Sequence, residues 1–290
     1  MNRIWTLLDA HRSLTEFLSR HGVEEPRLAS EIVTAHALGM KRIDIYTKFD
    51  QPLTAEELDA VRKLGKRLAA GEALQLVVGD AQFFSYFFAV RQGVFIPRPE
   101  TETLVDTAAR FMKNRGEDAA PPTLLDLCTG SGVIAVTMLK FLPYATAVAT
   151  EISPAAVDLA RENAEKLGVT DRIEVLEGNL FEPLAPGAVF DAITANPPYI
   201  PTHDILRVEP VVKDNDPNAA LDGGSDGLDV IRRIAAGAPA RLAPGGFIAL
   251  EVGAGQAGDV ETILKGEGFA RTEMRRDLSG IERVVTGWME

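Results

Sequence analysis

Cysteine is nearly absent from this 290-residue chain, because Cys128 is the only one. A single cysteine excludes an intrachain disulfide. With only four histidines beside it, a Cys/His metal cluster is also disfavoured, and we expect no metal site. Chains without disulfides are typical of reducing compartments, so we expect a cytoplasmic location.

Long hydrophobic runs are missing as well. No apolar stretch approaches the ~20 residues that a membrane-spanning helix needs. The N-terminal residues reach charged side chains by Asp9 and Arg12, which is not the pattern of a signal peptide. We therefore expect no membrane partner.

Positive charge is in deficit, with 30 Lys and Arg against 42 Asp and Glu and a net charge of −12. The deficit is uneven: residues 1–90 carry −1 and residues 91–290 carry −11. Such a surface repels a phosphate backbone on average. We therefore expect no direct DNA binding.

Two phosphate-binding loops are also absent: the chain has neither Gly-x-x-x-x-Gly-Lys-Ser/Thr nor a full Gly-x-Gly-x-x-Gly. It has instead an apolar strand at about 123–128 that runs into Thr129-Gly130-Ser131-Gly132. A glycine-rich turn at the carboxyl end of a strand is where open α/β sheets bind ligands. Glu151 ends the next predicted strand and is suited to accept hydrogen bonds from ribose hydroxyls. This pair of features fits NAD as well as S-adenosylmethionine.

Asp126, beside the glycine turn, favours one of these two cofactors. Its carboxylate suits the amino group of a methionine moiety and would repel a pyrophosphate. The absence of the two phosphate-binding loops also favours S-adenosylmethionine over a nucleotide di- or triphosphate. We therefore predict S-adenosylmethionine as the cofactor.

The hydrophobic pattern of the sequence changes twice along the chain and divides it into three parts. Helical periodicity predicts three helices in the first part, at about 4–18, 26–38 and 54–70. The aromatic and β-branched segment 74–90 predicts a hairpin that turns at Gly79-Asp80. The corresponding domains are a helical domain over 1–73, a connector over 74–98 and a third domain over 99–290.

From Pro99 onward, helices alternate with apolar strands. The predicted strands lie near 123–128, 146–151, 172–176, 189–195, 246–252, 270–276 and 282–288. The predicted helices lie near 99–113, 132–141, 154–167, 226–241 and 256–265. This alternation predicts an α/β fold with a doubly wound, mostly parallel, seven-stranded sheet that ends in an antiparallel hairpin.

The segment Asn196-Pro197-Pro198-Tyr199 follows one of these strands directly. The two prolines remove two backbone donors and stiffen the chain. The Asn196 side-chain oxygen and the neighbouring carbonyls remain as acceptors, and Tyr199 supplies a flat wall. Such a site suits a planar group that bears an NH₂, either a base amine or a carboxamide. The alternative is a Pro-Pro turn that ends the strand, with a packing tyrosine.

These motifs, in this order, resemble a class I S-adenosylmethionine-dependent methyltransferase that acts on an amino nitrogen. Further segments resemble the HemK/PrmC protein-glutamine methyltransferases over residues 20–288. They are Ile96-Pro97-Arg98-Pro99-Glu100-Thr101-Glu102, residues 216–228 (DPNAALDGGSDGL), Leu250-Glu251-Val252-Gly253 with Gln256, and residues 277–283 (DLSGIER). That family methylates the glutamine side-chain amide in the Gly-Gly-Gln loop of peptide chain release factors.

The resemblance implies roles for individual residues. Asn196 and the Pro197 carbonyl would hold the glutamine amide, while Pro198 and Tyr199 would complete the substrate pocket. Phe95 sits where the family places an aromatic ring that covers the site, although an apolar contact under the hairpin is an equal alternative. The cofactor would be held by a larger set: Asp126, Cys128, Thr129, Gly130, Ser131, Gly132, Glu151, Asn179, Leu180 and Asn196.

Three positions depart from the family pattern. Cys128 stands where the family often has glycine, and a reactive thiol is the less favoured interpretation. Asn179 stands where an aspartate commonly follows Gly178, and its amide still suits the adenine amino group. Leu180 would pack against the adenine where an aromatic ring would stack.

Arg98 and His203 are assigned no catalytic step. We expect Arg98 to form a structural ion pair, for instance with the helix start at Glu100, in preference to touching substrate. We expect His203 to be a solvated loop residue.

Three other functions share some of these motifs. A sister enzyme would methylate a glutamine of a large-subunit ribosomal protein. A nucleic-acid adenine amino-methyltransferase also uses Asn-Pro-Pro-Tyr but would need a basic recognition region. A non-catalytic cofactor-binding module would not need the intact acceptor motif.

Overall fold

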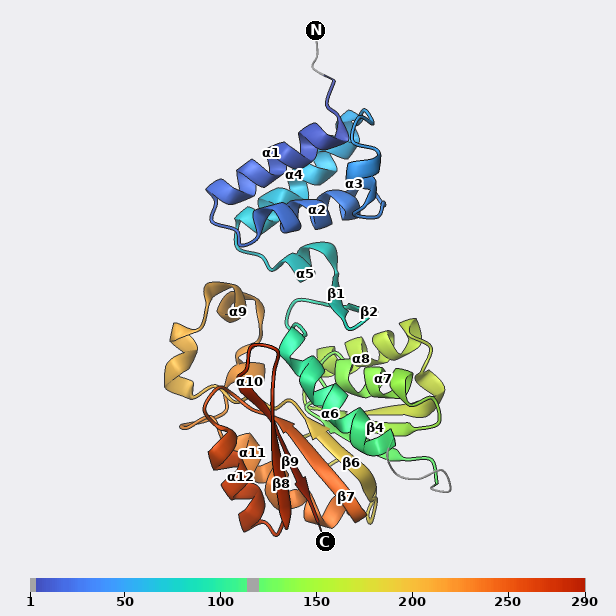
Figure 1. Cartoon of the computed structure of the whole chain (residues 1–290), viewed down its shortest axis with the longest axis vertical. Helices are drawn as coiled ribbons and strands as arrows, with labels where there is room; N and C mark the ends of the chain where they lie inside the picture. Colours follow the sequence, from blue (N-terminus) through green and yellow to red (C-terminus); the bar gives the residue numbers. More distant parts are fainter. Residues whose placement is uncertain (1–3, 114–119, 290) are drawn as a thin grey trace. The chain divides into compact units, whose positions relative to one another are not determined.

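The computed structural model describes residues 4–113 and 120–289 (Figure 1). The chain forms two compact units, each of which is described by itself. The first consists of Met1–Asp80 with Glu209–Asn215, and the second of Ala81–Val208 with Asp216–Glu290. The sequence did not predict that Glu209–Asn215 would join the first unit.

The first unit is helical, as predicted. Thr6 and Thr54 begin the two longest helices with capping boxes, in which each threonine accepts from the N3 backbone while the N3 carboxylate accepts from the cap. The apolar faces of these helices pack into one core that includes Leu14, Leu18 and Val33. The helices are α1 (Leu7–Arg20), α2 (Pro26–Ala37), α3 (Asp44–Thr47), α4 (Ala55–Ala69), α5 (Leu74–Val78) and α9 (Pro210–Asn215).

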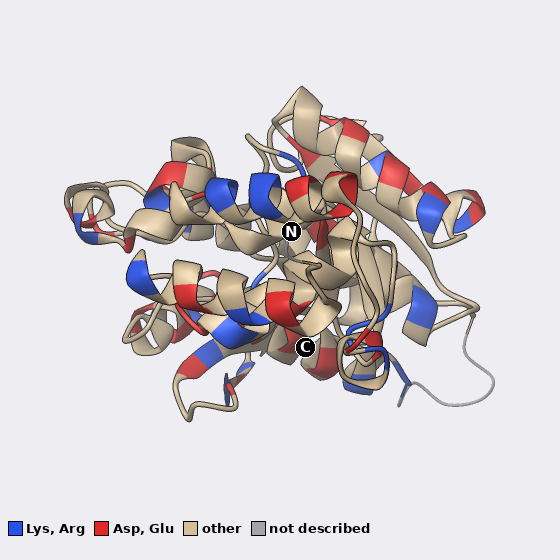
Figure 2. Cartoon of the chain, turned by 90° about the horizontal axis from the view of Figure 1, so that it is seen from above, with Lys and Arg blue, Asp and Glu red and all other residues tan. Residues whose placement is uncertain are grey.

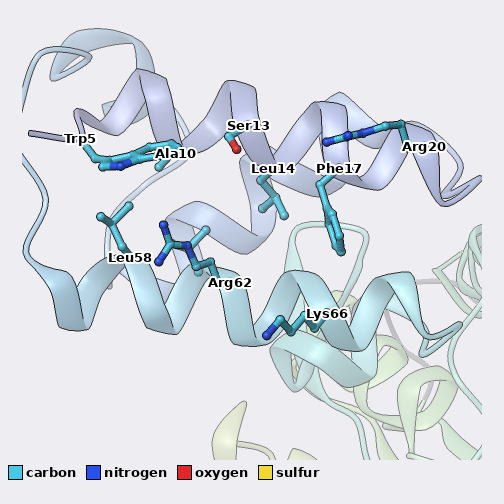
Figure 3. Close-up of a pocket in the computed structure, with 10 residues that line it drawn as sticks. Trp5, Ala10, Ser13, Leu14, Phe17, Arg20, Leu58, Arg62 and Lys66 are labelled. Carbon is cyan, nitrogen blue, oxygen red and sulfur yellow. The ribbon is translucent and has the colours of Figure 1, made fainter. Parts of the chain in front are cut away.

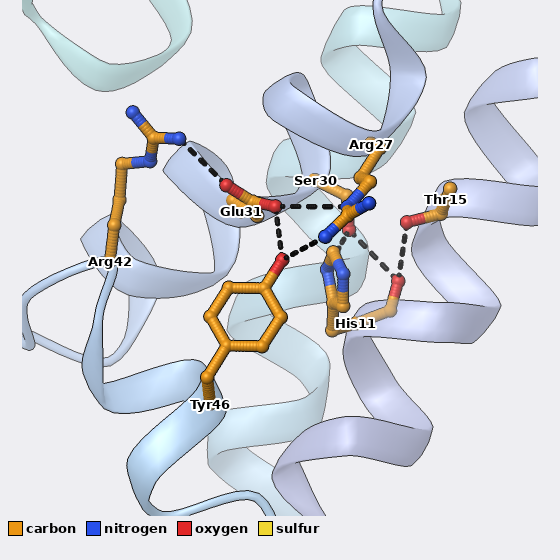
Figure 4. Close-up of polar contacts among 7 residues, drawn as sticks. All are labelled: His11, Thr15, Arg27, Ser30, Glu31, Arg42 and Tyr46. Carbon is orange, nitrogen blue, oxygen red and sulfur yellow. Dashed lines mark hydrogen bonds and ion pairs between the residues drawn. The ribbon is translucent and has the colours of Figure 1, made fainter.

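A polar network joins α1, α2 and α3 (Figure 4). Buried Glu31 on α2 accepts from Arg42 at 2.7 Å and from the Tyr46 hydroxyl. The preceding residue, Ser30, donates to the His11 carbonyl and also forms a hydrogen bond with the His11 ring, both at 2.9 Å. These bonds satisfy polar groups that would be costly to bury alone.

The prediction of a hairpin over residues 74–90 is wrong for the first part of this segment. Leu74–Val78 forms α5, and Gly79 ends this helix in the left-handed conformation, with φ of 79°, instead of turning a hairpin. The hairpin begins later, with β1 (Asp80–Phe83) and β2 (Tyr86–Ala89). Val77 is buried in the helical core, so tertiary packing decides the conformation of this short apolar run.

The second unit is built on a seven-stranded sheet in the order β5-β4-β3-β6-β7-β9-β8. The pairs β7–β9 and β8–β9 are antiparallel and the other four pairs are parallel, so the predicted doubly wound, mostly parallel sheet is confirmed. The strands are β3 (Thr123–Leu127), β4 (Thr146–Glu151), β5 (Ile173–Glu177), β6 (Phe190–Ala195), β7 (Leu242–Glu251), β8 (Arg271–Arg276) and β9 (Glu282–Trp288).

Helices cover both faces of this sheet (Figure 1). Leu124 and Leu125 show the two-residue alternation of a strand: Leu124 packs with α6, α7 and α8, and Leu125 with α11 and α12. The helices are α6 (Glu102–Lys113), α7 (Val133–Phe141), α8 (Pro154–Lys166), α10 (Asn218–Leu221), α11 (Asp229–Gly237) and α12 (Ala257–Gly266). Shorter 3₁₀ turns include η1 (Pro99–Thr101) and η3 (Thr202–Arg207).

The strand order reverses direction between β3 and β6. From β3 the chain winds outward through β4 to β5, and then returns to place β6 on the other side of β3. Ligands bind at such a switch point because the loops that leave the two strands diverge there. In the described residues, no helix is both long and apolar enough to cross a membrane.

Asn163 on α8 connects the hairpin to the loop after β3. Its amide donates to the carbonyls of Ala89 (3.1 Å) and Ser131 (2.9 Å) and accepts from the Ala89 N–H (2.7 Å). The side chain is fully buried. Three backbone groups therefore depend on one side chain.

Replacing this residue, Asn163→Ala, should destabilise the protein by about 2–4 kcal/mol, because the backbone groups lose their partners in a buried place. Urea denaturation measures this change. Glu165→Ala, at an exposed position on the same helix, should stay within about 0.5 kcal/mol of the parent. Equal losses in the two variants would contradict this role of Asn163.

Candidate functional site

The strand register brings the predicted site residues to one edge of the sheet. Leu127 pairs with Thr150 of β4 and with Ala195 of β6, and Ala195 pairs with Leu250 of β7. Because these strands are parallel, their next residues lie at the same edge. Those residues are Cys128, Glu151, Asn196 and Glu251.

The turn after β3 depends on left-handed backbone. Cys128, Gly130 and Gly132 have φ values of 55°, 56° and 82°. A Cβ on Gly132 would lie 3.1 Å from the Cβ of Ala160 on α8, so glycine also allows the turn to approach that helix. The positive φ at position 128 explains why glycine suits this place and why cysteine departs from the pattern. Burial raises the pKa of the Cys128 thiol, which keeps it protonated and unreactive.

Glu151 is fixed by the backbone on both sides. One carboxylate oxygen accepts from Gly130 N–H at 2.9 Å, and the other accepts from Ser153 N–H at 2.9 Å. Each oxygen keeps a second lone pair. The carboxylate is thus oriented in advance and retains two acceptor positions, and its contact with a ribose stays a prediction.

Asp126 lies under the turn and is fully buried. It accepts from the Thr129 hydroxyl at 2.5 Å and from the Thr194 hydroxyl at 2.7 Å. Burial raises its pKa to about 7 despite these two donors. Asp126 therefore braces the turn, and its contact with a methionine amino group stays a prediction.

Asn179 and Leu180 follow β5 at the same edge. Gly178 N–H donates to the Glu151 carbonyl at 2.9 Å, which holds the start of this loop against the end of β4. Leu180 is buried, with a φ of 53°, while the Asn179 amide donates to Glu182 at 3.1 Å. Their contacts with adenine stay predictions.

The Asn-Pro-Pro-Tyr segment is held by groups distant in sequence. The Asn196 amide donates to the Thr101 hydroxyl at 3.2 Å. The Tyr199 carbonyl accepts from Gln256 Nε2 at 2.9 Å, and the Tyr199 hydroxyl donates to Glu251 at 3.4 Å. Gln256 is itself fixed, because its oxygen accepts from Gly253 N–H at 2.8 Å. The segment is clamped at both ends.

Gly227 completes this clamp and was not identified from the sequence. Its φ is 80°, and a Cβ there would lie 2.3 Å from the Tyr199 carbonyl oxygen and 2.7 Å from Gln256 Nε2. It belongs to the segment 216–228, which the family resemblance covers without assigning a role. The glycine-rich composition of this segment was the sequence signal that could have drawn attention to Gly227.

Arg98 and Phe95 lie beside this region. Arg98 forms an ion pair with buried Asp216, and the same carboxylate accepts from Ile96 N–H at 2.9 Å. The predicted structural pairing is therefore correct, but Glu100 is the wrong partner. The Arg98 guanidinium lies 5.2 Å from the centre of the half-buried Phe95 ring, which limits the ring's movement. The covering role of Phe95 stays a prediction.

Two further expectations concern histidine and metals. His203 is exposed in the turn after the Asn-Pro-Pro-Tyr segment, 3.4 Å from Asp204, as expected for a solvated loop residue. Within residues 4–113 and 120–289, no group of His, Cys, Asp and Glu side chains has a metal-binding arrangement.

The sheet order, the glycine turn, Glu151 and the Asn-Pro-Pro-Tyr segment define a methyltransferase of the doubly wound α/β class. Residues 9–79 match the PrmC N-terminal domain family, and residues 86–212 match the methyltransferase small domain family. The N-terminal domain of human METTL16 in complex with SAH has a similar fold, with a TM-score of 0.54 and 16% identity. That similarity covers 77% of this chain and 83% of the other.

Sequence relatives narrow the class to one family. A release factor glutamine methyltransferase from Geobacter sulfurreducens is 44% identical over 98% of this chain and 97% of its own length. One from Rhodopirellula baltica is 38% identical over 97% of this chain and 96% of its own length. The chain belongs to the release factor glutamine methyltransferase family.

Gly227→Ala should lower methyl transfer by tenfold or more, because the added Cβ displaces the Tyr199 carbonyl and a small displacement at a reacting site is costly. Steady-state kinetics measures this loss. Gly280→Ala is the matched control, since Gly280 has the same φ of 80° but nothing within 4 Å of its Cβ position. Similar kinetics for the two variants would remove Gly227 from the clamp.

Proposed function

We propose that this protein transfers a methyl group from S-adenosylmethionine to the side-chain amide nitrogen of the glutamine in the Gly-Gly-Gln loop of peptide chain release factors. The observation that carries the proposal is the orientation of Asn196. Its NH₂ group donates to Thr101, so its oxygen remains to accept from a substrate NH₂. Full-length similarity to release factor glutamine methyltransferases supports the same substrate.

The protein's own part in the reaction is to position the amide. The Asn196 oxygen and the Pro197 carbonyl accept the two amide hydrogens, and Pro198 and Tyr199 form the wall against the planar group. A delocalised amide nitrogen is a poor nucleophile because its lone pair is shared with the carbonyl. The nitrogen would approach the methyl carbon opposite the bond from that carbon to sulfur, and it would lose one of its two protons as the N–methyl bond forms. Holding two reactants in near-attack geometry supplies about 7–11 kcal/mol.

The cofactor supplies a methyl group activated by the sulfonium. Glu151 would hold its ribose with the two acceptor positions described above. The turn from Cys128 to Gly132 would lie against its methionine part, with Asp126 near the amino group. Asn179 and Leu180 would contact the adenine, and Phe95 would cover the site.

A protein substrate agrees with the charge distribution better than a nucleic acid does. Acidic and basic residues are interleaved along the helices in the view of Figure 2, without one continuous basic stripe on that side. A nucleic-acid methyltransferase would need such a stripe. A release factor substrate also implies a cytoplasmic location, which fits the single cysteine.

The first prediction from this function concerns substrate choice. With labelled S-adenosylmethionine and purified release factor, ribosomes or DNA in separate reactions, label should enter only the release factor. Replacing the glutamine of its Gly-Gly-Gln loop should abolish the label. Asn196→Ala should slow single-turnover transfer by about 10²-fold, as expected when one preorganised hydrogen bond at the reacting group is lost. Cofactor affinity, measured by calorimetry, should fall far less than the rate, because Asn196 is one of ten residues expected at the cofactor.

Other outcomes of this experiment would decide against the proposal. Label in ribosomes alone would favour the ribosomal-protein activity, and label in DNA would favour the adenine activity. Near wild-type transfer by Asn196→Ala would remove Asn196 from the amide site.

We further propose that the first unit recognises the release factor through a groove between α1 and α4 (Figure 3). The groove has a volume of about 220 Å³ and combines apolar side chains, such as Trp5, Leu14 and Phe17, with basic ones. The basic residues are Arg20, Arg62 and Lys66, and none of the described residues that line the groove is acidic. In a chain with a net charge of −12, this local excess of cations favours an acidic segment with apolar side chains.

The double charge reversal Arg62→Glu/Lys66→Glu should therefore raise KM for the release factor by tenfold or more. The value of kcat and the cofactor affinity should change less than twofold, since the groove is formed by residues of the first unit and the proposed reacting groups belong to the second. Lys63→Glu, on the same helix but outside the groove, is the matched control. An unchanged KM in the double variant would exclude the groove as the docking surface.

A further inference from the structure

The loop that follows β7 contacts Tyr199 at three points within six residues. Glu251, the last residue of β7, accepts from the Tyr199 hydroxyl at 3.4 Å. A Cβ added to Gly253 would lie 3.2 Å from Cδ2 of Tyr199, so the ring lies against that glycine. Gln256 donates from Nε2 to the Tyr199 carbonyl at 2.9 Å. Residues 251–256 therefore hold the hydroxyl, the ring and the carbonyl of one tyrosine.

Gln256 stands at the N-cap of α12, yet its side chain makes no capping hydrogen bond. Ser, Thr, Asp and Asn are the residues that cap helices well, and glutamine is not among them. Its amide bonds instead to Gly253 N–H at 2.8 Å and to the Tyr199 carbonyl. This side chain thus joins two loops, the one after β7 and the one after β6.

The two partners of Gln256 match only one orientation of its amide. A backbone N–H can only donate, and a backbone carbonyl can only accept. The Gln256 oxygen must therefore face Gly253, and its nitrogen must face Tyr199. An ionised carboxylate at position 256 could serve Gly253 but not the Tyr199 carbonyl, because it has no hydrogen to donate.

Two glycines leave room for the two ends of the Gln256 amide. A Cβ on Gly253 would lie 2.7 Å from the Gln256 oxygen, and a Cβ on Gly227 would lie 2.7 Å from its nitrogen. The two glycines belong to different segments of the chain. The amide therefore occupies a slot that a side chain on either glycine would narrow.

The stiffness of the Asn-Pro-Pro-Tyr segment makes the position of the Tyr199 carbonyl matter for the amide site. The two prolines each have a fixed φ, so the chain from Asn196 to Tyr199 has few rotations that could absorb a displacement. Beyond Tyr199 the backbone is also held, because Ile200 N–H donates to the Leu221 carbonyl at 2.9 Å. A shift of Tyr199 would therefore move the Pro197 carbonyl as well.

We propose that Gln256 is a positioning residue, which holds the Tyr199 carbonyl so that the Pro197 carbonyl and the Tyr199 ring meet the substrate amide. Gln256 acts through Tyr199 and not on the reacting atoms themselves. The inference rests on the proposed function, since it assigns the support of the proposed amide site. Loss of the hydrogens on Nε2, at nearly unchanged side-chain size, should slow the reaction and leave binding intact.

The test replaces Gln256 by two side chains of similar size. At pH 8, Gln256→Glu and Gln256→Met should each lower kcat on release factor by tenfold or more, because neither donates to the Tyr199 carbonyl and a small displacement at a reacting group is costly. KM and cofactor affinity should stay within threefold, and the stoichiometry of cofactor binding gives the folded fraction. Gln82→Glu is the matched control and should leave kcat within twofold, because exposed Gln82 also donates to a backbone carbonyl, that of Phe84 at 3.1 Å.

The pH dependence of the two variants separates positioning from loss of packing. A protonated carboxyl at position 256 can donate to the Tyr199 carbonyl while its other oxygen accepts from Gly253, so it reproduces the amide. The kcat of Gln256→Glu, divided by that of the parent at the same pH, should therefore rise at least twofold as the pH is lowered from 8 to 6. The same ratio for Gln256→Met should stay constant. The charged groups around Tyr199 are the same in the parent and both variants: Glu251, Glu100 and Arg283.

A second pair of variants tests the slot. Gly253→Ala should lower kcat by tenfold or more, because the added Cβ displaces the Gln256 oxygen and the Tyr199 ring. Gly258→Ala, in α12, is the control and should leave kcat within twofold, since nothing lies within 4 Å of its Cβ position.

Three results would overturn the inference. They are a parent-like kcat in Gln256→Met, a ratio for Gln256→Glu that does not change with pH, or a fall in cofactor affinity that matches the fall in kcat. An inactive parent enzyme on release factor would instead reject the proposed function itself, so the two failures are distinguishable.

Discussion

The parallel pairing of β3 with β4 on one side and with β6 on the other determines where the binding groups lie. Parallel strands deliver their carboxyl ends to one edge, and the reversal of winding between β3 and β6 separates the loops there. The cofactor turn leaves from β3 and the acceptor segment from β6. The proposed cofactor and amide sites thus begin on adjacent strands, one residue beyond the paired Leu127 and Ala195.

Burial of acidic groups accompanies this arrangement. Asp126 and Glu251 are both almost inaccessible to solvent, and burial raises the pKa of each to about 7. Among the described residues neither forms an ion pair, although Arg283 stabilises the charged form of Glu251. Hydroxyl groups of Thr129, Thr194 and Tyr199 donate to them. Hydroxyl partners fix the geometry of a carboxyl group without neutralising it. The sheet therefore holds two carboxyl groups whose protonation is sensitive near neutral pH.

Local patterns in the sequence predicted the sheet, its helices and the motifs at its edge, because hydrophobic periodicity and glycine or proline signals are local. The prediction failed at Leu74–Val78, where burial of Val77 overrides a strand-like composition. It also assigned Arg98 to nearby Glu100, whereas the partner is Asp216, 118 positions away. Thr101, Gly227 and Gln256 act on Asn196 or Tyr199 from distant positions, and no spacing rule along the chain connects them.

Neither unit is an uninterrupted stretch of chain. Asn215 belongs with the helical unit, where its side chain accepts from Ala73 N–H at 3.1 Å and donates to the Gly71 carbonyl at 3.1 Å. Its neighbour Asp216 belongs with the sheet unit, where it bonds Ile96 and Arg98. The chain therefore passes between the units at Asp80, again before Glu209 and again after Asn215. A single cleavage of the chain therefore cannot release the helical unit intact. A gene that lost its first 80 codons would leave Glu209–Asn215 without the helical residues against which it packs.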